Sequence, residues 1–336
     1  MNKIKLLSLG ALMVTAMYAN AQTTAHTKPT GYVTHTLKAG QFNLIGLTLH
    51  NPVVASGDIQ GFTGGTQITD NDINFANVLT AGKTYILEIT DAADTSLNGT
   101  IQEVTVWGAN TFDTPQDLQA EGLAVGDKYQ LRACKTISDI FGADNSAGLT
   151  GGASASLADN IYIPTVAGFD IYYYSTGGFF GVGWRKVGSG ATDFATLAFV
   201  SSDGFYIYRQ PSSDLDFVLT GAVKTINTSV AVTGKYTFVS AVYPVGATLD
   251  SSGMQNSLTG GASASIADNV YIQNATSAFD IYYYSTGGFF GVGWRKVGAA
   301  SVDQGDVPLP SAFIIARTGT TDFNVDLSEP AGYEDL

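Results

Sequence analysis

The feature that most constrains the fold is an internal repeat. Residues 169–188 read FDIYYYSTGGFFGVGWRKVG, and residues 279–298 repeat these twenty residues, 110 positions later. A second shared block, LTGGASAS, begins at Leu149 and again at Leu258. Weaker similarity extends the match over 129–221 and 236–327. A duplication of this length indicates two copies of one structural unit rather than a chance motif.

The hydrophobic pattern along the repeats has a period of two residues. It is clearest in 84–89, 103–107 and 169–174, which are rich in Val, Ile, Thr, Tyr and Phe. Such residues suit a pleated, half-buried surface. The sequence STGG at 175–178 joins two apolar runs as a hairpin turn. We therefore predict an all-β fold of sandwich or small-barrel units with an internal duplication and a few short helical turns.

The first 21 residues have the features of a secretory signal peptide. Lys3 and Lys5 precede an apolar run at 6–17, and Ala19-Asn20-Ala21 fits a cleavage site. We expect export to the extracellular space or the cell surface, with the periplasm as a further location.

The rest of the chain is predicted to form three parts. These are an N-terminal β domain at 22–133, repeat unit A at 134–222 and repeat unit B at 223–336, with A and B able to pack as one body. A fainter similarity between 31–44 and 221–238 suggests that the N-terminal region opens with the same strands and then diverges.

Charge and cysteine content exclude several classes of protein. Only 13% of the residues are charged, about half the usual ~25%. Without Lys3 and Lys5 the chain has 29 acidic and 14 basic residues, a net charge of −15, which argues against nucleic-acid binding. We expect no transmembrane helix, because no second long apolar run is present. The one cysteine, Cys134, excludes a disulfide framework, and we interpret it as a buried, inert thiol.

No recognisable catalytic motif is present, so we expect a protein that is not an enzyme and has no cofactor. Asp70, Asp72 and Asn74 have the oxygen spacing of a calcium-binding loop. The sixth position of that loop is Phe75 rather than Gly, and the twelfth is Ala81 rather than Glu. We therefore interpret the segment as a turn, with a calcium site as the second interpretation.

The two identical aromatic hairpins are the candidate binding sites. Strand alternation places Tyr172 and Tyr174 on one face and Tyr173 on the other. At least one aromatic face must be covered, by the protein's own core or by a sugar or protein partner. The basic residues that follow either pair with a neighbouring molecule or keep the sheet edge soluble. The candidate residues are Tyr172, Tyr174, Trp184, Arg185, Tyr282, Tyr284, Trp294 and Arg295.

These motifs support a family resemblance. The order Leu-x-Gly-Gly, Ala-Asp-x-Ile/Val-Tyr-Ile, Tyr-Tyr-Tyr and Gly-Trp-Arg-Lys-Val-Gly resembles a family of uncharacterised exported, β-rich bacterial proteins with two such repeats. A segment like GKTYILEIT at 82–90 precedes the repeats in that family. The resemblance implies export, β architecture and two repeats, but no activity or catalytic residues.

Three functions fit these observations. The first is a secreted or surface-exposed, non-enzymatic structural or adhesive protein that associates with itself in an extracellular assembly. The second is a carbohydrate-binding module that uses the two hairpins to bind an extracellular polysaccharide. The third is an outer-membrane β-barrel, which alternating strands and an acidic composition would suit.

Overall fold

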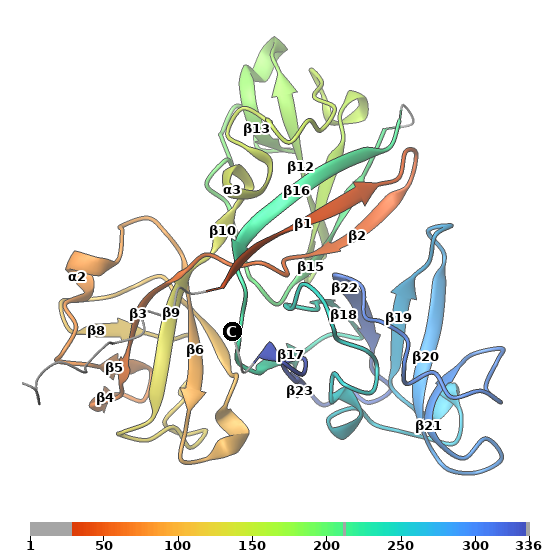
Figure 1. Cartoon of the computed structure of the whole chain (residues 1–336). Helices are drawn as coiled ribbons and strands as arrows, with labels where there is room; N and C mark the ends of the chain where they lie inside the picture. Colours follow the sequence, from red (N-terminus) through yellow and green to blue (C-terminus); the bar gives the residue numbers. More distant parts are fainter. Residues whose placement is uncertain (1–28, 211–212, 334–336) are drawn as a thin grey trace, which may run out of the picture.

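The computed structural model describes residues 29–210 and 213–333, and these residues form an all-β protein (Figure 1). Among these described residues, helical structure is limited to the short helices α2 (Phe75–Val78) and α3 (Ile137–Phe141) and to 3-10 turns. The 3-10 turns are η2 (Thr95–Leu97), η3 (Ala155–Leu157), η4 (Gly178–Phe180), η5 (Met254–Asn256) and η6 (Ala264–Ile266). Within this part of the chain, no helix has the length and apolar character needed to cross a membrane. The predicted signal peptide, 1–21, lies outside the described residues.

Unit A consists of a five-stranded antiparallel sheet and a two-stranded ribbon. The sheet has the order β13-β12-β11-β15-β2, and the ribbon is β1-β16. A short pair, β10-β14, lies beside them. The strands are β1 (Thr30–Leu37), β2 (Phe42–Gly46), β10 (Lys135–Thr136), β11 (Asn160–Thr165), β12 (Gly168–Thr176), β13 (Val182–Lys186), β14 (Ala198–Phe199), β15 (Gly204–Tyr208) and β16 (Leu215–Ala222). The core lies between ribbon and sheet, because Leu37 and Phe217 of the ribbon share a cluster with Trp184 of the sheet.

Unit B repeats this arrangement. Its sheet has the order β21-β20-β19-β22-β18, and its ribbon is β17-β23. The strands are β17 (Thr228–Val232), β18 (Tyr236–Ser240), β19 (Asn269–Gln273), β20 (Phe279–Thr286), β21 (Val292–Lys296), β22 (Ala312–Ala316) and β23 (Phe323–Leu327). The register is the same in both hairpins, since Tyr173 lies opposite Arg185 and Tyr283 lies opposite Arg295. The predicted duplication is thus a duplication of seven strands.

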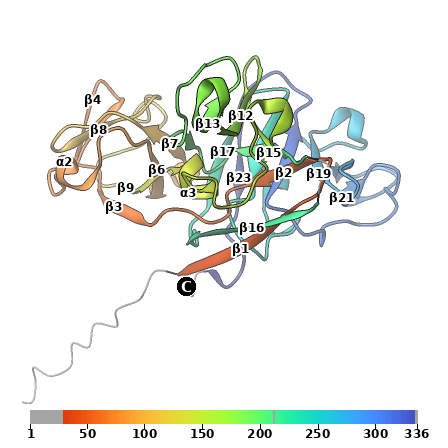
Figure 2. The same cartoon turned by 90° about the horizontal axis from the view of Figure 1, so that it is seen from above.

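An inserted region between β2 and β10 forms two further sheets. Their orders are β3-β9-β6-β7 and β4-β5-β8. The strands are β3 (Val53–Asp58), β4 (Gly61–Thr63), β5 (Gln67–Thr69), β6 (Tyr85–Asp91), β7 (Ile101–Val104), β8 (Thr111–Asp113) and β9 (Lys128–Ala133). Leu87, Phe112 and Tyr129 belong to its separate core. In Figure 2 this region lies at one end of the molecule, and β19 and β21 of unit B lie at the other.

Strand pairing corrects the predicted boundary between the N-terminal domain and unit A. Residues 22–133 were expected to form one domain, yet β1 pairs with β16, and β2 pairs with β15. Unit A therefore begins at β1 and is interrupted by the inserted region. The weak similarity of 31–44 to 221–238 is explained by this arrangement, because β1 and β2 are the counterparts of β17 and β18.

A buried charge cluster joins the three parts. Glu88 on β6 accepts hydrogen bonds from Arg132 Nε on β9 at 2.8 Å and from Lys224 Nζ at 2.7 Å. Lys224 belongs to the link between units A and B, and its side chain, like that of Glu88, is 1% exposed. Arg132 also donates to the carbonyl of Asn51, which lies in the link between β2 and β3. Burial opposes ionisation of Glu88, but the two cations outweigh it and lower its pKa to about 2.

Candidate functional site

The predicted aromatic residues of the hairpins are mostly core residues. Tyr172 and Trp184 are buried in unit A, and Tyr282 and Trp294 are buried in unit B. Period-two alternation predicts two faces but does not say which one the ribbon covers. These four rings therefore cannot form an exposed sugar platform.

The remaining two predicted tyrosines lie beside the tryptophans. Tyr174 is half-buried with its ring 5.3 Å from that of Trp184, and Tyr284 is half-buried with its ring 5.7 Å from that of Trp294. Both pairs have a near edge-to-face geometry, which suits packing between aromatic rings.

The predicted arginines protect the outer edge of each sheet. Arg185 is buried and donates to the carbonyls of Phe180, Val182 and Trp184 at 3.0, 2.6 and 3.1 Å. Arg295 makes the corresponding bonds in unit B. The Trp184 and Trp294 carbonyls also accept from the backbone amides of Phe194 and Gln304. Because β13 and β21 are edge strands, the arginines cover carbonyls at an edge where a strand of another molecule could otherwise pair. Each guanidinium also pairs with an aspartate of its own chain, so the arginines are satisfied internally.

The same arginines hold two exposed Phe-Phe loops, 177–181 and 287–291. Phe179 and Phe289 at their tips are each 96% exposed. The glycines at 177, 178 and 181 have φ values of 138°, 82° and 71°, and those of the second loop match them closely. These backbone angles favour glycine, so both loops adopt the same conformation. Two phenylalanines between glycines at a hairpin turn are the sequence signal for these loops.

The predicted calcium residues form a turn in the inserted region. Asp70 is buried and accepts hydrogen bonds from the Tyr129 hydroxyl at 2.8 Å and from the Asp72 amide at 2.9 Å. Asp72 accepts from Gln60 at 2.6 Å, and Asn74 precedes α2 without capping it by its side chain. Across 29–210 and 213–333, no three His, Cys, Asp or Glu side chains are grouped so that they could hold a metal ion.

A seam between units A and B brings their sheets together. Leu44 of β2 packs with Ala312 and Ile314 of β22 in a small buried cluster. A Cβ added to Gly46 would lie 2.0 Å from the carbonyl oxygen of Ser311, so the backbones approach closely. Gln273 of unit B bonds to the backbone of β2 through both its side-chain oxygen and its nitrogen, each at 2.8 Å.

An aromatic groove, which we call the seam groove, opens along this seam. Its walls are Phe42, Tyr162, Phe169, Tyr206 and Phe279, together with Gln273 and Ser277. Phe42 and Phe169 are 42% and 44% exposed. The hydroxyls of Tyr162 and Tyr206 make no hydrogen bond to the described residues, and burial raises the pKa of Tyr206 to about 12. Both tyrosines therefore remain protonated at neutral pH and available as donors.

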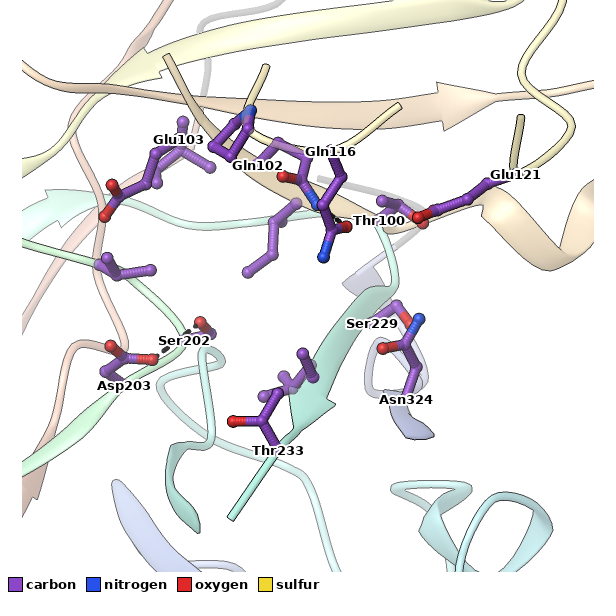
Figure 3. Close-up of a pocket in the computed structure, with 16 residues that line it drawn as sticks. Thr100, Gln102, Glu103, Gln116, Glu121, Ser202, Asp203, Ser229, Thr233 and Asn324 are labelled. Carbon is purple, nitrogen blue, oxygen red and sulfur yellow. Dashed lines mark hydrogen bonds between the residues drawn. The ribbon is translucent and has the colours of Figure 1, made fainter. Parts of the chain in front are cut away.

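A polar pocket lies where the inserted region meets both units, and we call it the junction pocket (Figure 3). Its volume is about 340 Å³, at the lower end of the range for ligand sites. The polar residues that line it are Thr100, Gln102, Glu103, Gln116, Glu121, Ser202, Asp203, Ser229, Thr233 and Asn324. Gln102 Nε2 donates to Gln116 Oε1 at 2.6 Å.

The carboxylates of the junction pocket give it a negative potential. Figure 3 shows Glu103 and Asp203 on one side of the pocket and Glu121 on another. Asp203 lies between the junction pocket and a neighbouring hollow. Desolvation of its carboxyl group, with a further contribution from the charge of Glu103, raises its pKa to about 6. Cys134 is buried as predicted, and burial raises its pKa to about 12, so it is a thiol at neutral pH.

The junction pocket and the seam groove lie along one surface. A shallow depression beside β18 shares Asp203 and Thr233 with the junction pocket and extends to Phe238. The Phe238 ring packs 5.6 Å from that of Phe169 and 5.3 Å from that of Tyr206, both in the wall of the seam groove. We call the three hollows together the seam cleft.

Comparison of the chain with protein-family models, curated proteins and solved structures finds no match.

The chemistry of the seam cleft follows from its two ends. The seam groove offers ring faces for stacking and two phenolic donors. The junction pocket offers amides, hydroxyls and carboxylates for hydrogen bonds, and none of its lining residues is Lys, Arg or His. An elongated ligand with apolar faces and polar edges is complementary to both ends. The sequence did not reveal the cleft, because its aromatic residues lie up to 237 positions apart, from Phe42 to Phe279.

Proposed function

We propose that this protein is an exported, non-enzymatic adhesive protein that binds an extracellular polysaccharide along the seam cleft. The observation that carries the proposal is the seam groove, in which Phe42 and Phe169 expose more than two fifths of their surface in a concave site. Sugar rings have apolar C–H faces and polar rims, so they stack on aromatic rings while their hydroxyls bond to neighbouring polar groups. Tyrosines serve this role well, because each has an apolar ring and a polar tip.

This proposal moves carbohydrate binding from the hairpins to the seam. The hairpin rings pack in the cores of the two units, whereas Phe42 and Phe169 of the seam groove remain partly exposed. A groove that spans two units fits several sugar units of one chain, as expected for adhesion to a polymer.

We expect Phe42→Ala and Phe169→Ala each to weaken polysaccharide binding roughly tenfold, which corresponds to ~1.4 kcal/mol. Affinity electrophoresis against a panel of soluble extracellular polysaccharides measures the change, and Phe179→Ala is the matched control for loss of an exposed ring. Chromatography of the polysaccharide after incubation should show unchanged chain length. Equal retardation of the wild type and both groove variants would contradict the proposal, as would retardation of none of them by any polysaccharide.

Self-association is a second candidate function, favoured by the Phe-Phe loops. Each chain presents two loops of the same sequence and conformation, each with an almost fully exposed phenylalanine. Burial of one such side chain contributes about 1.5–3 kcal/mol. Two sites on one chain would allow chains to link into larger assemblies. Pairing through the edges of β13 and β21 is disfavoured, because Arg185 and Arg295 occupy those carbonyls.

The double variant Phe179→Ala/Phe289→Ala is expected to abolish concentration-dependent association while leaving thermal stability unchanged. Sedimentation velocity over a wide concentration range gives the assembly size, and Phe42→Ala serves as the control. A wild-type protein that stays monomeric at the highest concentration would rule out this second function.

A further inference from the structure

We infer that the junction pocket selects sugar units by charge, accepting neutral or amine-bearing units and rejecting those with sulfate or carboxylate groups. This inference deepens the proposed function and rests on it. The junction pocket is a concave cavity of about 340 Å³, and residues of the inserted region and of both units line it.

The polar lining of this pocket has unused hydrogen-bonding capacity. Thr233, Ser229 and Asn324 make no side-chain hydrogen bond to described residues, and Figure 3 shows them along one side of the cavity. Across from them, Gln102 Nε2 donates to Gln116 Oε1. The Oε1 of Gln102 and the Nε2 of Gln116 therefore have no partner among the described residues. These groups can both donate to and accept from the hydroxyls of a sugar.

The charges in the pocket then decide which sugars fit. Glu103, Glu121 and Asp203 are its charged lining residues, and no cation offsets them there. An anionic group that enters would lose water and meet like charges, whereas an ammonium group would gain attraction. The raised pKa of Asp203 has the same origin, because its ionised form is poorly solvated beside Glu103.

The experiment keeps one sugar backbone and changes only its charge. The probes are β-1,4-linked glucosamine oligomers of equal length that carry free amines, N-acetyl groups or N-sulfate groups. Calorimetry at pH 7 with the full-length mature protein should show affinities for the amine and acetyl forms at least tenfold higher than for the sulfated form.

The double variant Glu103→Gln/Asp203→Asn keeps the size of both side chains, removes their charge and replaces one acceptor oxygen of each with an N–H donor. It should bind the sulfated form at least tenfold more tightly than the wild type does and bind the amine form less tightly. Asp144→Asn/Asp306→Asn, which removes two exposed charges outside the pocket, should keep the wild-type order.

Two results would overturn the charge inference. One is wild-type binding of the sulfated form as tight as that of the acetyl form, and the other is a double variant with the wild-type order. Failure of all three probes, with intact polysaccharide binding through Phe42 and Phe169, also rejects this pocket as a sugar subsite. The proposed function itself fails only if the groove variants bind as the wild type does or no polysaccharide binds.

Discussion

Replacement of Glu88 by Gln is expected to lower the free energy of unfolding by about 3–5 kcal/mol. The variant removes the one anion of the buried charge cluster and leaves Lys224 and Arg132 without a counter-charge. Isolated cations in the protein interior are far costlier than a paired set, because they have lost their water without gaining an ion pair. Urea unfolding of the purified protein measures the change.

Lys224→Met should be less destabilising than Glu88→Gln, because it leaves Glu88 paired with Arg132. The double variant should be more stable than the sum of the two single changes predicts, since the two side chains interact directly. Glu103→Gln is the control, because Glu103 is an exposed carboxylate on the neighbouring strand β7. The idea that this cluster joins the three parts is untenable if Glu88→Gln behaves like the control.

Acidification should produce a second large effect through two buried histidines. Burial lowers the pKa of both His35 and His50 to about 4, from an ordinary value of 6.5. Between these values the unfolded chain binds protons that the folded chain excludes. The folded state therefore has its full stability above pH 6.5. Its free energy of unfolding decreases as the pH falls towards 4, by ~3 kcal/mol for each histidine.

His35→Phe separates this effect from the titration of carboxyl groups. The His35 ring stacks on Phe217 at 5.2 Å, and its Nε2 has no partner, so phenylalanine fits the site. Melting temperatures of both proteins should agree within a few degrees at pH 7.5, with the variant distinctly higher at pH 4.5. His50→Phe is not equivalent, because the Nε2 of His50 donates to the carbonyl of Val242 at 2.8 Å. An identical pH dependence of the wild type and His35→Phe would refute the explanation.

The sequence predicts much of the architecture but little of the site. The period-two pattern predicts an all-β chain, and the identical hairpins predict a duplicated unit, because both features can be read from short stretches of sequence. The assignment of the first strands, β1 and β2, to the N-terminal domain is wrong for a non-local reason. Strand β1 pairs with a distant strand, with Thr30 opposite Ala222, 192 positions later in the chain, and no local pattern records this distance.

The candidate site fails prediction for a related reason. The hairpin tyrosines attract attention because they are adjacent in sequence, yet adjacency on a strand says nothing about which face is covered. Phe42 and Phe279 belong to different units and meet only at the seam. Nothing in the sequence distinguishes Asp203 from the other aspartates, and only the fold places it near Glu103.

The insertion between β2 and β10 also orders the events of folding. As the chain emerges from its amino end, β1 and β2 appear first but remain unpaired until β15 and β16 follow. The strands of the inserted region, β3 to β9, form sheets only with one another, so this region can fold before unit A is complete. Unit B is continuous from β17 to β23 and needs no such delay. Two copies of one architecture in the same chain therefore face different kinetic problems, and the early, exposed strands β1 and β2 are where misfolding would begin.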